Sequence, residues 1–282
     1  EDCIKRCILE ATKSLFPRKI DALFFDVTTL YFESVRADEL RNFGFSKDCK
    51  FKETQVVLAL IATTDGLPIT YKLFPGNTSE GKTLLATIQN LKRDFEVNHV
   101  VLAADRAMFS EDNLLSMEAE KIKYVVAAKL KGMSRVEKKN ILDARNYGVL
   151  QHSDADTVWV GETLHKGRRL ITSLSYARAE KDAADRNRVV SRLLQKSKEG
   201  NINVKELIPN HGKKRFITIE GAKAKLNESK IEEDAQWDGM HGIITNDREA
   251  SAAELLKRYH GLWQIEESFR VNKHTLRMRP IY

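Results

Sequence analysis

Two aspartates interrupt or end apolar runs that are typical of buried β-strands. Asp26 stands inside the run 22–32, which is rich in aromatic and β-branched residues, and Asp105 directly follows the apolar run 99–104. Burying an unpaired charge costs a large free energy, so each carboxylate needs a partner. Any fold of this chain must therefore satisfy two acidic groups, one inside a core strand and one directly after a core strand.

Further strand and helix patterns surround the two aspartates. A helix is predicted over residues 3–15, and the turn Asp65-Gly66 joins two strands in a hairpin. The predicted order after 22–32 is strand 54–64, strand 68–74, helix 81–95, strand 99–104, helix 110–121 and strand 123–129. Three antiparallel strands, then helix, strand, helix and strand, predict an α/β fold: a ribonuclease-H-like mixed sheet flanked by helices.

The sequence from 131 to 236 differs from its surroundings, with more polar residues and shorter strand patterns. We predict an amphipathic helix at about 179–198 among short strands near 157–160, 168–175 and 214–219. One more core strand, 242–246, and a helix over 250–273 come next. The predicted organisation is a first core part, 1–130, an inserted strand-rich subdomain, 131–236, and a second core part, 237–282, with the helix that bears Glu266.

The composition predicts a basic protein of a reducing compartment. Lysine and arginine exceed aspartate and glutamate by 47 − 40 = 7, and a basic surface attracts polyanions such as nucleic acid. Three cysteines, an odd number, do not indicate a secreted disulfide framework, and Cys3 and Cys7 lack the further ligands of a zinc site. No apolar run approaches the roughly 20 residues that span a bilayer. We expect a cytoplasmic protein without a membrane partner and, since Glu1 is not an initiator methionine, a fragment of a longer protein.

Two readings account for Asp26 and Asp105. A single aspartate at a strand end often caps a loop or a helix. Alternatively, both carboxylates hold a hard divalent cation, which takes oxygen ligands and offsets the repulsion between converging acids. Because the two residues are 105 − 26 = 79 positions apart, only the fold can make them neighbours.

A third carboxylate is expected from the last predicted helix. One stripe of this helix, at 100° per residue, holds Tyr259, Glu266, Arg270 and Lys273. Glu266 is therefore expected to face inward. Glu267 points about a quarter turn away and is expected in solvent, with the ligand role as its alternative. Trp263 on the same helix is expected in the core.

Five motifs occur in order between about residues 20 and 280. They are Phe24-Phe25-Asp26-Val27-Thr28-Thr29, Gly44-Phe45-Ser46-Lys47-Asp48, Gly76-Asn77-Thr78-Ser79-Glu80, Asp105-Arg106-Ala107-Met108-Phe109-Ser110 and Tyr259…Glu266…Lys273. Together they resemble bacterial insertion-sequence transposases of the DDE class, and more narrowly the branch with a β-rich insertion between the second Asp and the Glu. The separation of 266 − 105 = 161 residues between Asp105 and Glu266 also favours an insertion.

The helical signature of that branch is Tyr, two residues, Arg, three residues, Glu, six residues, Lys. Here it falls on Tyr259, Leu262, Glu266 and Lys273, so three of its four residues match. Leu262 stands where the branch has arginine, which puts that DNA contact in doubt. Arg258, one turn earlier, is the substitute that the sequence offers.

The resemblance implies a DNA cleavage and strand-transfer enzyme with two Mg²⁺ ions, for which Mn²⁺ is expected to substitute. Asp26 would bridge both ions, and Asp105 and Glu266 would each hold one. Water would cut a strand, and the freed 3′-hydroxyl would attack another phosphate, with a hairpin as one route. The implied partners are double-stranded transposon-end DNA, target DNA and, on DNA, a second copy of the chain, in the nucleoid of a bacterial cytoplasm.

Cationic and aromatic side chains are predicted to contact DNA in this reading. The residues expected to hold DNA beside the site are Tyr259, Lys273, Arg106 and Arg270. Solvated or ion-paired surface positions are the alternative for the three cations. Trp159 and Trp237 are candidates for stacking on a flipped base, and ordinary core packing is the alternative for each.

Two other functions share these features. A ribonuclease-H-like nuclease would cut DNA without strand transfer, and a domesticated transposase would bind DNA through its basic surface without catalysis. The insertion and the helix with Tyr259 and Glu266 argue against the first function, and the intact acidic triad argues against the second.

Overall fold

The computed structural model describes most of the chain between residues 22 and 281. The described residues are 3, 7, 22–45, 52–63, 68–79, 82–84, 86–87, 101–104, 110–152, 156–198, 216–220, 223–271, 275 and 280–281. The chain divides into two compact units. The first unit comprises residues 1–128, 165–169 and 243–282, and the second unit comprises residues 129–164 and 170–242.

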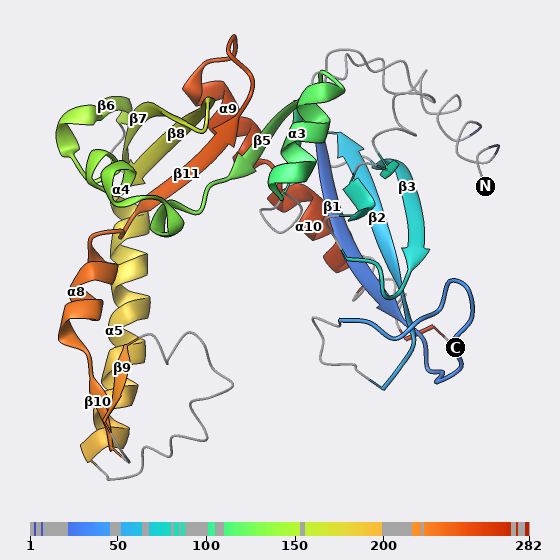
Figure 1. Ribbon diagram of the computed structural model, residues 1–282, viewed down its shortest axis with the longest axis horizontal. Helices are drawn as coiled ribbons and strands as arrows, with labels where there is room; N and C mark the ends of the chain where they lie inside the picture. Colours follow the sequence, from blue (N-terminus) through green and yellow to red (C-terminus); the bar gives the residue numbers. More distant parts are fainter. Residues whose placement is uncertain are drawn as a thin grey trace. The chain divides into compact units, whose positions relative to one another are not determined.

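The first unit is built on a mixed sheet (Figure 1). Its strands are β1 (Ala22–Tyr31), β2 (Gln55–Thr63), β3 (Pro68–Pro75), β4 (Val101–Ala104), β5 (Lys123–Ala127) and the end of β11 (Met240–Thr245), which belongs to this unit from Ile243 on. They lie in the order β3-β2-β1-β4-β5-β11. The pairs β1–β2 and β2–β3 are antiparallel, β1–β4 and β4–β5 are parallel, and β5–β11 is antiparallel. The predicted ribonuclease-H-like mixed sheet, with its three leading antiparallel strands, is thus confirmed.

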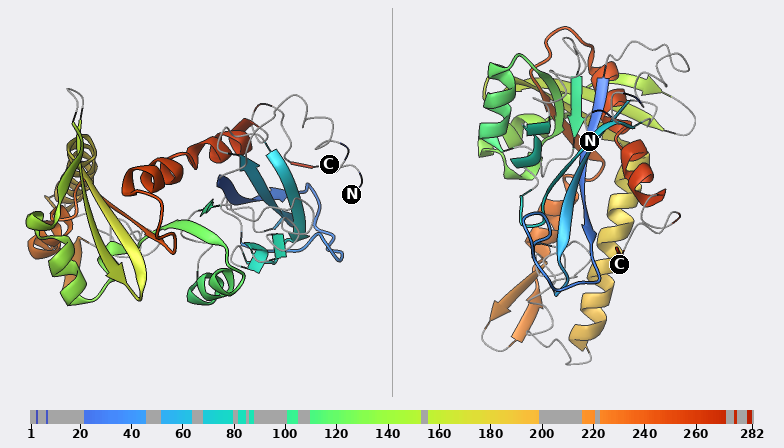
Figure 2. Two further views of the ribbon diagram at one scale, coloured as in Figure 1. Left: turned by 90° about the horizontal axis from the view of Figure 1, so that it is seen from above. Right: turned by 90° about the vertical axis from the view of Figure 1, so that its right-hand side faces the viewer.

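Helices cover both faces of this sheet, as expected for strands that are buried on both sides. Helix α3 (Glu111–Ala119) contacts β5, α9 (Ala252–His260) contacts β4 and β5, and α10 (Trp263–Arg270) contacts β1. In the left panel of Figure 2, α3 lies on the opposite side of β5 from α9 and α10. The central strands accordingly carry apolar side chains in consecutive positions, such as Leu23, Phe24 and Phe25, all at most 1% exposed.

The helix ends follow from local capping. The hydroxyl of Ser110 accepts the Asn113 backbone N–H at the start of α3, and Ser251 accepts the Glu254 N–H at the start of α9. At its other end α9 stops at its C-cap, Gly261, and α10 begins two residues later. The single helix predicted over 250–273 is therefore wrong as one continuous element, because Gly261 and Leu262 form a turn between α9 and α10.

The second unit contains short strands and one long helix. Its elements are α4 (Arg135–Ile141), β6 (Gly148–His152), β7 (Thr157–His165), β8 (Arg168–Ser175), α5 (Tyr176–Lys198), β9 (Ile217–Glu220), β10 (Lys223–Leu226) and α8 (Glu228–Ala235), with 3-10 turns at Leu130–Gly132 and Ala144–Asn146. Strands β6, β7 and β8 are neighbours, and β9 and β10 form an antiparallel hairpin. The first residues of β8, Arg168 and Arg169, belong to the first unit.

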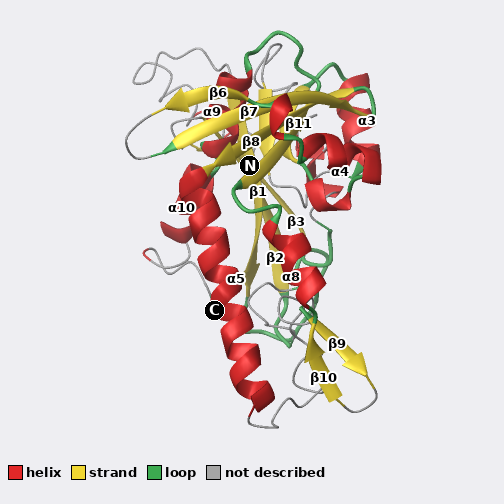
Figure 3. Ribbon diagram, turned by 90° about the vertical axis from the view of Figure 1, so that its left-hand side faces the viewer, coloured by secondary structure: helices red, strands yellow, loops and turns green. Residues whose placement is uncertain are grey.

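Helix α5 is held along one face by apolar packing. Leu193 is buried with Phe216 and Ile217, and partly buried side chains of α5, β10 and α8 pack against them: Val189, Val190, Leu226 and Ile231. Figure 3 shows α5 beside α8 and the β9–β10 hairpin. Arg186, on the same face, forms an ion pair with Asp238. The face opposite these residues is left to solvent.

The structure tests many of the predicted elements. The strands near 22–32, 54–64, 68–74, 123–129 and 168–175 and the helices near 110–121 and 179–198 are confirmed to within a few residues. The turn Asp65-Gly66 and most of the predicted helices 3–15 and 81–95 lie outside the described residues. No helix within the described ranges is long and apolar enough to cross a membrane.

Candidate active site

Asp26 lies in the middle of β1, on a face of the sheet that a helix covers. Side chains alternate along a strand, so Asp26 shares its face with Phe24 and Thr28. The Asp26 side chain is half-buried, and its Oδ1 accepts the Val27 backbone N–H at 2.7 Å. This carboxylate therefore stands at the edge of the core with access to solvent.

Helix α10 packs on the same face of the sheet as Asp26. Ile265 and Phe269 are 1% and 5% exposed and belong to one apolar cluster with Phe24 and Leu60. Leu60 is the residue opposite Asp26 across the β1–β2 pair. The buried side of α10 is thus seated over the part of the sheet that carries Asp26.

The β1–β4 register brings the neighbours of both predicted aspartates together. Ala103 is paired with Phe24, and Ala104 is paired with Phe25 in parallel strands. Phe25 directly precedes Asp26, and Ala104 directly precedes Asp105 in the sequence. Asp105 and Arg106 themselves lie outside the described residues.

Glu266 does not turn inward as the helical stripe predicts. It is exposed, whereas Ile265 and Phe269 form the buried side of α10. The stripe assumed 100° per residue from Tyr259 to Glu266, and the helix break at Gly261 removes that regular relationship. Tyr259 is half-buried, and its ring lies 6.5 Å from the ring of His260.

Glu267 is engaged by a neighbour on its own helix. Arg270 Nε donates to Glu267 Oε2 at 2.7 Å, and the two side chains form an ion pair. The hydrogen bond from Arg270 lowers the pKa of Glu267 below its usual range. Arg270, a predicted DNA contact, is thus exposed and already paired with a carboxylate, while Lys273 lies outside the described residues.

Trp263 on α10 is exposed. It is 61% exposed, so the prediction that it lies in the core is wrong, because α10 turns Ile265 and Phe269 toward the sheet instead.

The position of the signature arginine is apolar here. Leu262, which replaces that arginine, packs against the apolar cluster. Arg258 donates to Glu254 at 2.6 Å and lies 4.0 Å from the buried Asp247, so its guanidinium is already held within the first unit.

Two of the sequence motifs meet at the end of β1. A Cβ atom on Gly44 would lie 2.0 Å from the carbonyl oxygen of Gly76, so only glycine allows this approach. The buried amide Nε2 of Gln55 donates to the carbonyls of Phe45 and Gly76, at 3.1 and 2.9 Å. Gln55 has no distinguishing pattern in the sequence, since it is an isolated glutamine at the first position of the apolar strand β2.

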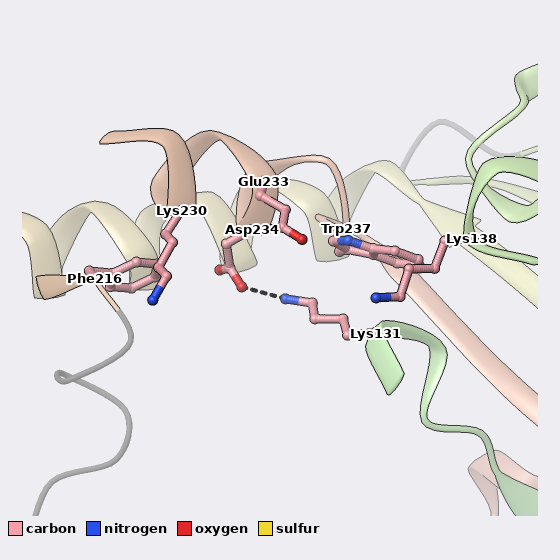
Figure 4. Close-up of a pocket in the computed structure, with 7 residues that line it drawn as sticks. All are labelled: Lys131, Lys138, Phe216, Lys230, Glu233, Asp234 and Trp237. Carbon is pink, nitrogen blue, oxygen red and sulfur yellow. Dashed lines mark hydrogen bonds and ion pairs between the residues drawn. The ribbon is translucent and has the colours of Figure 1, made fainter. Parts of the chain in front are cut away.

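In the second unit, Trp237 forms a wall of a pocket of about 250 Å³ (Figure 4). The other lining residues are Lys131, Lys138, Phe216, Lys230, Glu233 and Asp234. Trp237 is 7% exposed, and Lys131 pairs with Asp234 at 2.5 Å beside it. The pocket has no signal in the sequence, because the helix α8, which supplies three of its residues, is short and has no buried residue that would mark it.

Trp159 has a different environment. It is half-buried in β7, and its ring meets the ring of Tyr176 edge to face, with 4.6 Å between centroids. Tyr176 is 62% exposed, so this aromatic pair lies at the surface of the second unit. DNA contact therefore stays a prediction for both tryptophans. Trp237 lines a pocket, and Trp159 lies at the surface of the second unit.

No preassembled metal cluster is visible in the described part of the chain. Among the described residues, no three His, Cys, Asp or Glu side chains lie close enough together to hold a metal ion. Of the three predicted ligands, only Asp26 and Glu266 are among those residues.

Comparison with known proteins supplies the family. The sequence matches the family described as "Transposase DDE domain" over residues 17–281. None of the curated proteins compared with the chain matches it.

Solved structures of transposases are also similar to this chain. The piggyBac transposase synaptic complex with hairpin DNA is 9% identical, with a TM-score of 0.43, over 89% of this chain and 40% of that one. The Mos1 paired-end complex with the left transposon end is 16% identical, with a TM-score of 0.27, over 43% and 39% of the two chains. The Mos1 strand transfer complex is 15% identical, with a TM-score of 0.27, over 44% and 39%.

The chain thus spans about two fifths of the length of the solved structures that it matches. The family match, in contrast, covers nearly the whole sequence and includes both the strand of Asp26 and the helix of Glu266. The chain belongs to the transposase DDE domain family.

Proposed function

We propose that this chain is the catalytic part of a transposase, which cuts double-stranded DNA at transposon ends and joins the freed 3′-hydroxyl to a phosphate of target DNA. The observation that carries the proposal is the β1–β4 register, which ends at Phe25 and Ala104, directly before Asp26 and Asp105. Paired residues of neighbouring parallel strands share a face of the sheet. In the proposal, Asp105 therefore continues the register beside Asp26.

Glu266 is the proposed third carboxylate. Ile265 and Phe269 seat α10 on the cluster that contains Leu60, the partner of Asp26 across β2. Glu266 lies on this helix with its side chain exposed, whereas the carboxylate of Glu267 is bound to Arg270. The choice of Glu266 over Glu267 rests on this difference.

The donor chemistry fits a hard divalent cation. Three carboxylates offer only oxygen ligands, which Mg²⁺ prefers, and the resemblance to DDE transposases implies this acidic triad. We propose two Mg²⁺ ions, replaceable by Mn²⁺, held by Asp26, Asp105 and Glu266. When bound, such ions supply a water-derived nucleophile and stabilise charge on the attacked phosphate and the leaving oxygen.

The remaining residues position DNA. Arg106, Lys273 and, once released from Glu267, Arg270 would hold backbone phosphates, and Tyr259 would lie beside the strand that is cut. In this proposal the region 131–236 is an insertion in the core, and a base from the transposon end stacks on Trp237 in its lysine-lined pocket. Trp159 is the second candidate for that stacking. A second copy of the chain would assemble with the first on DNA.

The test is metal-dependent cleavage by single variants. Asp26→Asn, Asp105→Asn and Glu266→Gln should each abolish cleavage in Mg²⁺ and in Mn²⁺ while DNA binding survives, and Glu267→Gln should still cleave. Cleavage retained in Glu266→Gln and lost in Glu267→Gln would transfer the role to Glu267. Unchanged activity in Asp26→Asn would contradict the proposal.

A second assay separates strand transfer from simple hydrolysis. A pre-cut DNA end with a free 3′-hydroxyl should be joined to a target duplex by the wild-type chain. Cleavage without any joined product would favour a ribonuclease-H-like nuclease. DNA binding without cleavage or joining in the wild-type chain would favour a non-catalytic DNA-binding protein.

A further inference from the structure

The solvent face of α5 carries a row of cations, one of which, Arg188, forms an ion pair with Asp185 of the same helix. Its exposed members are Lys181, Arg188 and Arg192, at spacings of seven and four residues. Those spacings place the three side chains on one stripe of the helix. The opposite side of α5 holds Arg186 and Leu193, which are buried in the second unit.

The charge pattern changes along the helix. Its first half mixes signs, since Arg178 lies 3.7 Å from Asp182, and Asp185, which shares the stripe of Lys181, lies 3.2 Å from Arg188. From Arg186 to the end of α5 the sequence has five cations and no acid: Arg186, Arg188, Arg192, Lys196 and Lys198. Arg186 is buried and paired with Asp238, whereas Arg188 and Arg192 are exposed, so the exposed face of this half carries positive charge and favours an anionic partner.

Stabilisation of the helix itself does not account for the row. Cations favour the C-terminal end of a helix through its dipole, but the effect falls off within the last turn. Arg188 and Arg192 stand ten and six residues before the final residue, Lys198. Arg192 forms no ion pair with any carboxylate of the described residues.

We propose that this stripe, Lys181, Arg188 and Arg192, binds the phosphate backbone of duplex DNA. The proposal rests on the proposed function, because it takes DNA as the substrate, and it adds a second, sequence-independent surface outside the acidic site. The stripe is about 16 Å long at 1.5 Å per residue. Over that length, one DNA strand presents about five phosphates, one per 3.4 Å of axis.

The experiment measures DNA affinity against salt for the full chain, with a duplex of arbitrary sequence and EDTA in place of metal. The test variant is Arg188→Gln/Arg192→Gln, in which glutamine keeps a helix propensity close to that of arginine. The matched control is Arg135→Gln/Lys139→Gln, which removes two exposed cations from α4 in the same unit. Circular dichroism and thermal melting establish that both variants are folded.

Loss of two phosphate contacts should reduce the slope of log affinity against log salt by about 1.8, at about 0.9 for each contact. With equal affinities at about 1 M salt, this slope difference makes the test variant bind roughly 60-fold more weakly at about 0.1 M salt, while the control keeps the wild-type slope. An equal reduction of the salt slope in both variants, or an unchanged slope in the test variant, would overturn the proposal. Since no metal is present, the outcome is separate from the proposed function, whose failure would appear as absent cleavage with this salt dependence intact.

Discussion

Gly261 lies against the ring of Phe24, so closely that a Cβ atom at position 261 would come within 2.4 Å of the Phe24 Cζ atom. Phe24 stands two residues before Asp26 on the same face of β1 and packs in one cluster with Ile265 of α10. The missing side chain at the α9–α10 junction therefore determines how near α10, and with it Glu266, comes to the sheet.

Gly261→Ala should test this contact. The added methyl group has to displace Phe24 or α10, which should lower the free energy of unfolding by about 1–3 kcal/mol. Urea unfolding measures the loss, and cleavage should fall more than DNA binding because Glu266 moves with α10. Gly148→Ala is the control, since nothing lies within 4 Å of a Cβ atom there. Equal stability of the two variants would show that the junction is loosely packed.

Arg168 should be among the most sensitive positions in the first unit. Its side chain is 7% exposed, and the guanidinium donates to Glu118 at 2.7 Å and to Glu111 at 2.5 Å. Arg168→Met leaves these two carboxylates without their shared cation and should lower the free energy of unfolding by about 3 kcal/mol at neutral pH. Lys166→Met, which removes an exposed partner of Glu111, should cost less than about 1 kcal/mol. If urea unfolding gave comparable losses of unfolding free energy for Arg168→Met and Lys166→Met, this ranking would be contradicted.

The same ion pairs predict a pH dependence. Hydrogen bonds from Arg168 hold the pKa of Glu111 and of Glu118 below their ordinary value of 4.5. A carboxylate whose pKa is lower in the folded state than in the unfolded state stabilises the fold at pH values above its unfolded-state pKa. This stabilisation is lost as the pH falls through the folded-state pKa. The stability difference between wild type and Arg168→Met should therefore be full at neutral pH and shrink below about pH 4.5. A difference that stays constant down to acid pH would refute the assignment.

Trp237→Leu tests the proposed base contact. Stacking of a base on an aromatic ring contributes about 1–3 kcal/mol, so the variant should bind DNA ends with unpaired bases more weakly by that amount. Binding to a blunt duplex should change little, which separates stacking from a general loss of fold. Trp159→Leu provides the comparison, because that ring is paired with Tyr176 instead of lining a pocket. Equal losses for both kinds of DNA end would argue that Trp237 only packs the second unit.

The sheet of the first unit was predictable because its strands carry strong apolar runs. β2, for example, has seven buried residues among nine, and no helix pattern competes with it. The elements missed in the second unit, such as β6, α4 and α8, are short and largely exposed, so periodicity contains little information about them. Packing against α5, not local preference, determines where β10 and α8 lie.

The candidate site was predictable in its residue types but not in its geometry. Asp26 is recognisable in the sequence as a charge inside an apolar strand. The β1–β4 register that bears on Asp105, in contrast, comes from pairing between distant segments, which the sequence pattern does not show. The orientation of α10 was misjudged, since the 100° rule takes the helix as continuous through Gly261. The network around Arg168 was invisible because its partners lie 50 and 57 positions away.

The central claim is that Asp26, Asp105 and Glu266 converge on shared cations. A crystal structure of the chain soaked in Mn²⁺, with anomalous scattering recorded at the manganese edge, tests it directly. We predict manganese peaks with carboxylate oxygens of all three residues at coordinating distance, about 2.0–2.2 Å from an ion. Manganese bound elsewhere, or any of the three carboxylates well outside that reach, would contradict the account.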